Sequence, residues 1–189
     1  SDSPTLRLRR LDASTYEVME LVRERRITTL FQPIVDPRSR AVCGFEALSR
    51  GPSDSWLHSP QNLFAAARHS GCKLDLDFLC MQNAFRGFVA ARVPGQLFIN
   101  VSPETIYEEP NFTPRFLEMA RMELMPLDRC VIELTEESLL EDYERLRSTL
   151  QGLREAGCEI AIDDLGAGSS GLRTWSELKP DYVKIDRYF

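Results

Sequence analysis

Several features that would assign a chain to a common class of protein are missing from these 189 residues. No apolar run approaches the ~20 residues needed to cross a bilayer, so we expect no membrane span. The amino terminus lacks a basic segment followed by an apolar one, so we expect no signal peptide either. Residues 1–13 are interpreted instead as a linker or a remnant of expression.

The cysteines form no Cys-x-x-Cys pair, and the histidines form no pair with helical spacing. An odd number of widely spaced cysteines favours reduced core thiols in a cytoplasmic protein over disulfides or a zinc site. The five are Cys43, Cys72, Cys80, Cys130 and Cys158. The two histidines, His58 and His69, fall at the edges of predicted helices, so we assign them surface or capping roles.

Basic charge and the usual nucleophile motifs are also scarce. The chain has 23 Lys and Arg residues against 29 Asp and Glu residues, a net charge of −6. This balance excludes a generally basic nucleic-acid surface but allows a local phosphate pocket. The Gly-x-Ser-x-Gly elbow of serine hydrolases is absent. The glycines after Asp164 have neither the spacing of a dinucleotide fingerprint nor the Lys of a P-loop, and they indicate a flexible loop.

Short apolar runs alternate along the chain with longer helical ones. Two strands joined by a Pro-Arg-Ser-Arg turn, Thr29 to Val35 and Ala41 to Ser49, are predicted to pair antiparallel. Strands and helices then alternate, which favours βαβ units and a parallel sheet or barrel in one α/β domain, residues 14–189. The later strands are expected at Gln96 to Ser102, Cys130 to Glu136, Glu159 to Leu165 and Tyr182 to Asp186. The helices are expected at Thr15 to Arg26, Pro60 to Gly71, Leu74 to Arg92, Thr113 to Met122, Ser138 to Ala156 and Ser170 to Leu178.

Polar residues interrupt the carboxyl-terminal halves of several predicted strands. They are Glu46, Asn100, Ser102, Glu133, Thr135, Asp163, Asp164, Lys184 and Asp186. Burying several carboxylates together costs several kcal/mol each unless cations compensate, so the recurrence indicates a metal site. Active sites of (β/α) barrels form at these strand ends. Carboxylate and amide oxygens suit Mg²⁺ or Mn²⁺, and the candidate ligands are Glu46, Asn100, Glu133 and Asp163.

Six short motifs occur in an order and spacing that resemble those of the EAL family of cyclic di-GMP phosphodiesterases. They are Phe31-Gln32-Pro33-Ile34-Val35, Glu46-Ala47-Leu48-Ser49-Arg50, Asn100-Val101-Ser102, Glu133-Leu134-Thr135-Glu136, Asp163-Asp164-Leu165-Gly166-Ala167-Gly168 and Val183-Lys184-Ile185-Asp186. The resemblance covers residues 21 to 189. A single Glu-Ala-Leu triplet carries no signal, whereas six ordered motifs are specific.

The resemblance implies a TIM-like (β/α)₈ barrel with one antiparallel strand that cuts cyclic di-GMP to linear pGpG with Mg²⁺ or Mn²⁺, two ions in all. It implies that one ion is held by Glu46, Asn100, Glu133 and Asp163, and that Asp164 helps to hold the second. Lys184 would orient the water or stabilise charge, and Glu136 would anchor the loop after Asp164. The substrate contacts implied are Gln32, Leu48, Arg50 and Asp186.

The chain departs from the family pattern at Leu165, Ala167 and Ser169, where the family usually has Phe, often Thr, and an aromatic residue. The family also continues beyond the last motif through two more strands, one of which carries a glutamate. We therefore expect about six of the eight barrel strands here, as in a piece of a longer protein. Alone, such a piece is expected to associate through its open edges or to be poorly soluble, and to be inactive.

Two rival functions stay open beside the phosphodiesterase. One is a receptor or regulatory module that binds cyclic di-GMP without cutting it, which the loop departures favour. The other is a Mg²⁺-dependent barrel enzyme acting on small acids, which leaves the six motifs unexplained. A homodimer and fused sensory or GGDEF domains are compatible with the leading interpretation, and a polymeric nucleic acid is not an expected partner.

Overall fold

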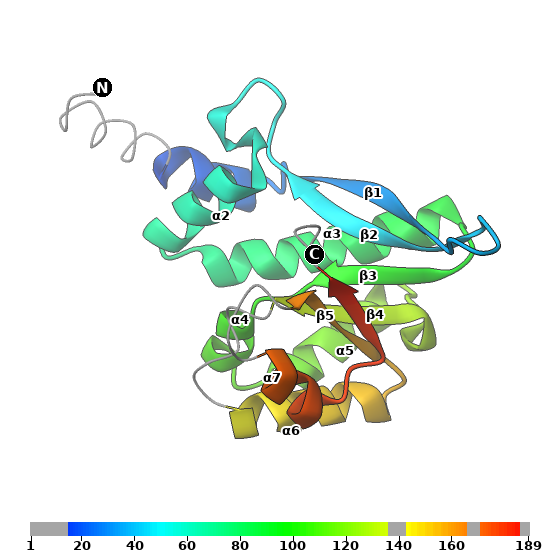
Figure 1. The fold of residues 1–189 in the computed structure, drawn as a ribbon. Coiled ribbons are helices and arrows are strands. Elements are labelled where there is room, and N and C mark those ends of the chain that lie inside the picture. The colour runs from blue at the N-terminus through cyan, green and yellow to red at the C-terminus, as the bar shows by residue number, and fades with distance from the viewer. Residues whose placement is uncertain (1–14, 136–142, 166–170, 186–189) are drawn as a thin grey trace.

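A computed structural model describes residues 15–135, 143–165 and 171–185, with only the backbone described at residues 164, 165, 171–174 and 185. Its centre is one sheet in the order β1-β2-β3-β4-β5-β6 (Figure 1). The strands are β1 (Thr28–Val35), β2 (Val42–Arg50), β3 (Gln96–Asn100), β4 (Cys130–Thr135), β5 (Glu159–Leu165) and β6 (Tyr182–Ile185). β1 is antiparallel to β2, and all other neighbours are parallel. The predicted α/β class with one antiparallel strand is confirmed.

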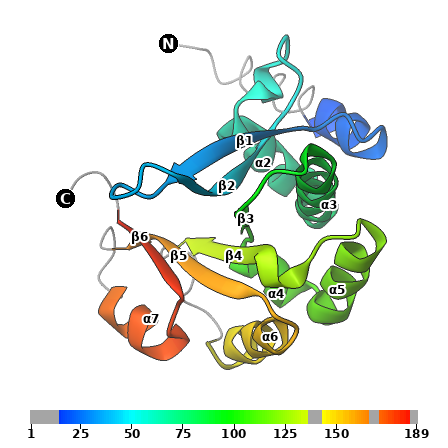
Figure 2. The same cartoon turned by 90° about the vertical axis from the view of Figure 1, so that its right-hand side faces the viewer.

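The strands curve into an arc, and helices surround its convex side (Figure 2). After a helix at residues 15–23, the helices are η1 (Trp56–His58), α2 (Pro60–His69), α3 (Lys73–Ala91), α4 (Pro103–Glu108), α5 (Phe112–Met122), η2 (Leu127–Arg129), α6 (Tyr143–Glu155) and α7 (Gly171–Leu178). Within the described residues β1 and β6 do not pair with each other, so the sheet is an unclosed barrel. No described helix is both long and apolar enough to cross a membrane.

The two faces of the sheet differ because successive side chains of a strand point to opposite sides. The convex face is apolar and packs on the helices, where Ile99, Ile132 and Ile160 are almost fully buried in the main core. The concave face has a small apolar cluster of Phe98, Val131, Ala161 and the partly buried Ile34. The polar residues at the strand ends lie directly beyond this cluster on the concave face, and we call the cluster the apolar floor of that face.

One helix in the first half of the chain was not predicted, and another ends for a reason that the sequence does not show. The short helix α4 was not predicted, because a six-residue segment directly after a strand has no readable period. Its first residue is Pro103, and β3 consequently ends at Asn100 rather than at Ser102. The helix predicted at Leu74 to Arg92 is α3 (Lys73–Ala91), and it ends there because Arg92, the residue that caps it, adopts a left-handed conformation with φ 51°.

Candidate functional site

The candidate site is a layer of polar side chains directly above the apolar floor of the concave face. Strand alternation places Asn100 two residues beyond Phe98 on β3, and Glu133 two residues beyond Val131 on β4. Asn100 and Glu133 are opposite each other in the β3–β4 register. On β3 and β4, the side chains that point to the concave face are therefore apolar in the middle of the strand and polar near its carboxyl end, and these polar side chains form the site.

Lys184 on β6 joins this layer together. Its Nζ donates to Glu46 Oε2 at 2.7 Å and to Glu133 Oε1 at 2.5 Å. The Asn100 side-chain amide donates to the other oxygen of Glu46, Oε1, at 3.1 Å. Four of the predicted site residues, from four different strands, thus form one connected group.

The electrostatics of the group are dominated by burial. Glu133 is fully buried, and burial raises its pKa to about 8, against the opposing charge of Lys184. The nearby charges of Glu46 and Asp163 act in the same direction as burial. Burial by itself lowers the pKa of Lys184, but the two carboxylates outweigh it and raise that pKa, so the ammonium stays charged. Burial and the neighbouring acids therefore oppose ionisation of Glu133 more strongly than Lys184 favours it.

The donor set fits a hard divalent cation. Glu133 Oε2 is buried and has no hydrogen-bond partner in the described part of the chain. Such an atom is costly unless a donor or cation reaches it. In the same described part, no three acidic, His or Cys side chains converge closely enough to hold an ion, and the Lys184 ammonium lies between the two carboxylates instead. Glu46 and Glu133 thus supply oxygen atoms of the type that a divalent cation prefers, and in this structure the Lys184 ammonium lies between them.

The other predicted ligands are placed less completely. Asp163 on β5 is partly buried and follows Ala161 on the concave side of the sheet. Asp164 is described only as backbone of the same strand. Glu136 and Asp186 lie outside the described residues, so their expected roles stay predictions.

The predicted substrate contacts lie on the antiparallel pair. Gln32 is opposite Glu46 in the β1–β2 register and is exposed. Leu48 and Arg50 follow Glu46 at alternate positions of β2, and both line a cavity of about 160 Å³ that Asn100 also lines. The Arg50 guanidinium donates to the Ser49 carbonyl at 2.8 Å, so its other donors can serve an anion.

A neighbouring group near this site was missed by the sequence analysis. Lys73 and Asp77 of α3 line a second cavity of about 250 Å³ together with Asn100, Glu133 and Thr135. Both are buried and form an ion pair at 2.7 Å. Charges spaced i, i+4 on the apolar side of a helix were the available signal.

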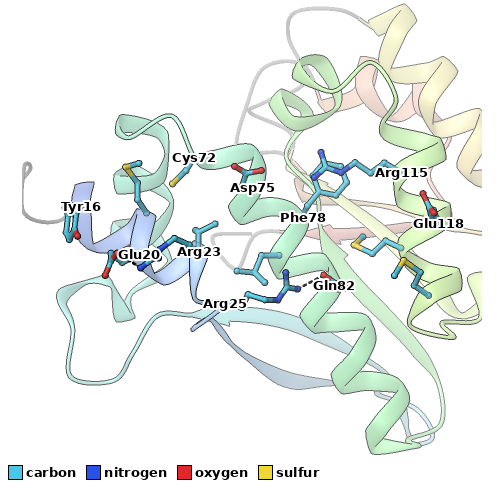
Figure 3. A pocket seen from close by; sticks show the side chains of 15 residues that line it. Tyr16, Glu20, Arg23, Arg25, Cys72, Asp75, Phe78, Gln82, Arg115 and Glu118 are labelled. Atoms are coloured by element: carbon cyan, nitrogen blue, oxygen red, sulfur yellow. Dashed lines mark hydrogen bonds and ion pairs between the residues drawn. The ribbon is translucent and has the colours of Figure 1, made fainter.

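A larger groove, of about 790 Å³, lies elsewhere, between the helix at residues 15–23, α3 and α5 (Figure 3). Several of its basic groups are already engaged: Arg23 pairs with Glu20 at 2.7 Å, and the Arg115 guanidinium stacks on the Phe78 ring. None of the predicted site residues lines this groove. It therefore plays no part in the chemistry of the strand ends.

The fold and the strand-end site together define a family. The EAL domain profile matches residues 16–189, and the chain belongs to the EAL domain family. An unclosed barrel with carboxylates and a lysine at its strand ends is the part of that domain described above.

Known proteins similar to the chain include two from Escherichia coli K12. One, named "Probable cyclic di-GMP phosphodiesterase PdeI", is 32% identical over 85% of this chain and 21% of its own length. The other, "Blue light- and temperature-regulated antirepressor BluF", is 29% identical over 83% of this chain and 38% of its own length. The solved manganese and cyclic di-GMP complex of Klebsiella pneumoniae BlrP1 is 28% identical, with a TM-score of 0.75 over 99% of this chain and 52% of that one. The chain spans about half or less of each of these proteins.

Proposed function

We propose that this chain is part of the catalytic EAL domain of a cytoplasmic signalling protein that hydrolyses cyclic di-GMP to linear pGpG with Mg²⁺ or Mn²⁺. The domain occupies residues 14–189, and residues 1–13 form a linker or an expression remnant. The observation that carries the proposal is the Lys184 ammonium held between Glu46 and Glu133, with Asn100 bonded to the same Glu46. Similarity to PdeI and to the manganese and cyclic di-GMP complex of BlrP1 supports it.

The ions would be held by the oxygens of Glu46, Asn100, Glu133 and Asp163, with Asp164 contributing to a second ion. Held by these residues, divalent ions would supply Lewis-acid chemistry, which activates water and stabilises the charge on a phosphodiester under attack. In this proposal Glu136 anchors the loop after Asp164, and Asp186 contacts the substrate.

The chain's own residues bind and orient the dianionic substrate. Arg50 offers a planar fork to phosphate oxygens, and Leu48 beside it provides an apolar contact in the cavity. Gln32, opposite Glu46, offers an amide at the same edge. Lys184 keeps its proton between two carboxylates and supplies positive charge where an attacked phosphate becomes more negative.

The test is turnover of cyclic di-GMP with Mn²⁺ or Mg²⁺, with pGpG separated by chromatography, on this chain and on one extended past Phe189. We expect pGpG from the extended chain, none in EDTA, and suppression by Ca²⁺, whose longer and looser coordination fits a two-ion site poorly. Glu133→Gln is expected to lower turnover by orders of magnitude while circular dichroism stays unchanged. Equal rates with and without EDTA would refute metal dependence.

A cyclic di-GMP receptor without turnover is the second candidate. The similarity to BluF, which is named an antirepressor, and the departures at Leu165, Ala167 and Ser169 favour it. Titration calorimetry and chromatography together discriminate the two candidates. A receptor binds cyclic di-GMP with an affinity that depends on Arg50, and the cyclic di-GMP stays intact after hours with Mn²⁺.

A further inference from the structure

A buried polar network outside the proposed ligand set connects α3 to α4. The Lys73 ammonium donates to Asp77 Oδ2 at 2.7 Å and to the Thr105 hydroxyl oxygen at 3.2 Å. The Thr105 hydroxyl in turn donates to the same Asp77 oxygen. Lys73, Asp77 and Thr105 are only 7%, 9% and 1% exposed. We call these three residues the α3–α4 clamp.

The clamp holds the helix that directly follows the strand carrying Asn100. α4 begins at Pro103, and only Val101 and Ser102 separate it from Asn100 at the end of β3. The Thr105 backbone N–H donates to the Ser102 carbonyl at 3.0 Å, which joins the first turn of α4 to this connection. The Val101 N–H donates to the Glu133 carbonyl at 2.9 Å, which fixes the connection to β4.

One clamp residue, Asp77, borders both cavities near the site. Asp77 and Asn100 line both cavities, so a displacement of Asp77 changes the shape of the space beside Asn100. A buried ion pair is seldom retained for stability alone, because apolar residues of similar volume often serve as well. The buried Lys73–Asp77 pair near the end of β3 therefore indicates that it helps to position this strand end.

We propose that Lys73, Asp77 and Thr105 are positioning residues that set the location of the Asn100 amide through α4. This inference rests on the proposed function, because it assigns the clamp to the support of one proposed ion ligand. Residues that orient metal ligands commonly change metal affinity or activity by about 10- to 100-fold when they are replaced.

The main test is Thr105→Val, which keeps the branched shape and removes the hydroxyl. We expect its Mn²⁺ dissociation constant, measured by calorimetry on the full chain, to rise about tenfold relative to wild type. The NMR resonance of the Asn100 side-chain amide, recorded without metal, is expected to shift. Thr105→Ser, which keeps a hydroxyl, is expected to restore both readouts toward wild type.

The matched control is Arg86→Met, which breaks another α3 ion pair, Arg86 to Glu123 at 2.7 Å, in a pair that lines neither cavity. It is expected to leave the Mn²⁺ constant and the Asn100 resonance unchanged. If Thr105→Val does not fold, Lys73→Met combined with Asp77→Leu removes both partners of the hydroxyl without leaving a buried charge unpaired, and it is expected to give the same changes.

Failure of the clamp and failure of the proposed function give different results. A folded Thr105→Val or double variant with the wild-type Asn100 resonance and Mn²⁺ constant overturns the positioning role. A shifted Asn100 resonance together with an extended chain that makes no pGpG with Mn²⁺ or Mg²⁺ supports the clamp and contradicts the phosphodiesterase. A shift caused equally by Arg86→Met would show a general effect of instability and would also overturn the positioning role.

Discussion

Lys184 is the residue on which the account of the site depends, because it connects carboxylates of β2 and β4 from the far strand β6. Its ammonium stabilises two partly or fully buried carboxylates that would otherwise repel each other. In the proposed function the same positive charge would also stabilise the substrate phosphate under attack.

Single substitutions separate substrate binding from chemistry. Arg50→Ala removes a charged hydrogen bond made in both ground and transition states, so KM is expected to rise about 10- to 100-fold with kcat little changed. Lys184→Ala removes a charge whose partner develops during attack, so kcat is expected to fall about 10²- to 10³-fold. Steady-state kinetics on the extended chain with Mn²⁺ measures both, and the opposite pattern would refute the two assignments.

Much of the site could be predicted from single residues, because a polar residue at an inward position of a strand end contradicts the surrounding apolar pattern. Glu46, Asn100, Glu133 and Lys184 were found this way, and the structure brings them together in one hydrogen-bonded group, while their functional roles stay predictions. The contact between Glu46 and Lys184 spans 138 residues and depends on the curvature of the sheet, which no local pattern encodes.

At the scale of elements, strands buried in the sheet were the easiest to predict and short connecting helices the hardest. β5 matches its predicted range, residues 159 to 165, because a short apolar run at residues 160–162 follows closely on the helix end at Gly157. α4 was missed because its six residues are too few to show a helical period of apolar residues, and tertiary contacts hold it in place. The clamp on α4 was missed with it, since an i, i+4 charge pair reads as a solvated pair until its burial is known.

Packing of α3 against the end of α5 gives a pH-dependent contact. Arg86 on α3 donates to Glu123, the residue that ends α5, and this hydrogen bond lowers the pKa of Glu123 below its usual 4.5. Since the pKa is lower in the folded state, the stabilisation is full above about pH 4.5 and is lost as the pH falls through the folded pKa.

Glu123→Gln is therefore expected to lower the free energy of unfolding by about 1 kcal/mol at pH 7. The difference from wild type is expected to shrink toward zero below pH 4. Urea titrations at several pH values measure it. A difference that stays constant from pH 7 to pH 3 would show that the Arg86 to Glu123 contact is not charge-dependent.

At the scale of the whole molecule, the open sheet is the main liability of the 189-residue chain. Its outer strands expose apolar side chains, with Leu30 49% exposed on β1 and Val183 37% exposed on β6. Unpaired strand edges of this kind favour pairing with another chain. The chain alone is therefore expected to self-associate at micromolar concentration and to make no pGpG.

Light scattering and the turnover assay test this prediction together. Val183→Lys, which places a charge on the outer strand, is expected to reduce association without changing the helical content seen by circular dichroism. A monodisperse wild-type monomer that makes pGpG at a substantial rate would show that the described strands already form a complete catalytic unit.

The most direct test of the central claim, that the polar strand ends form a divalent cation site, is Mn²⁺ binding to the 189-residue chain followed by electron paramagnetic resonance. Binding does not require the complete substrate pocket, so it is independent of turnover. We expect saturable binding to wild type and at least a tenfold weaker affinity for Glu133→Gln, which lacks a buried carboxylate of the set. Arg86→Met serves as the control and is expected to bind as wild type does. Equal Mn²⁺ affinity in wild type and Glu133→Gln would contradict the claim.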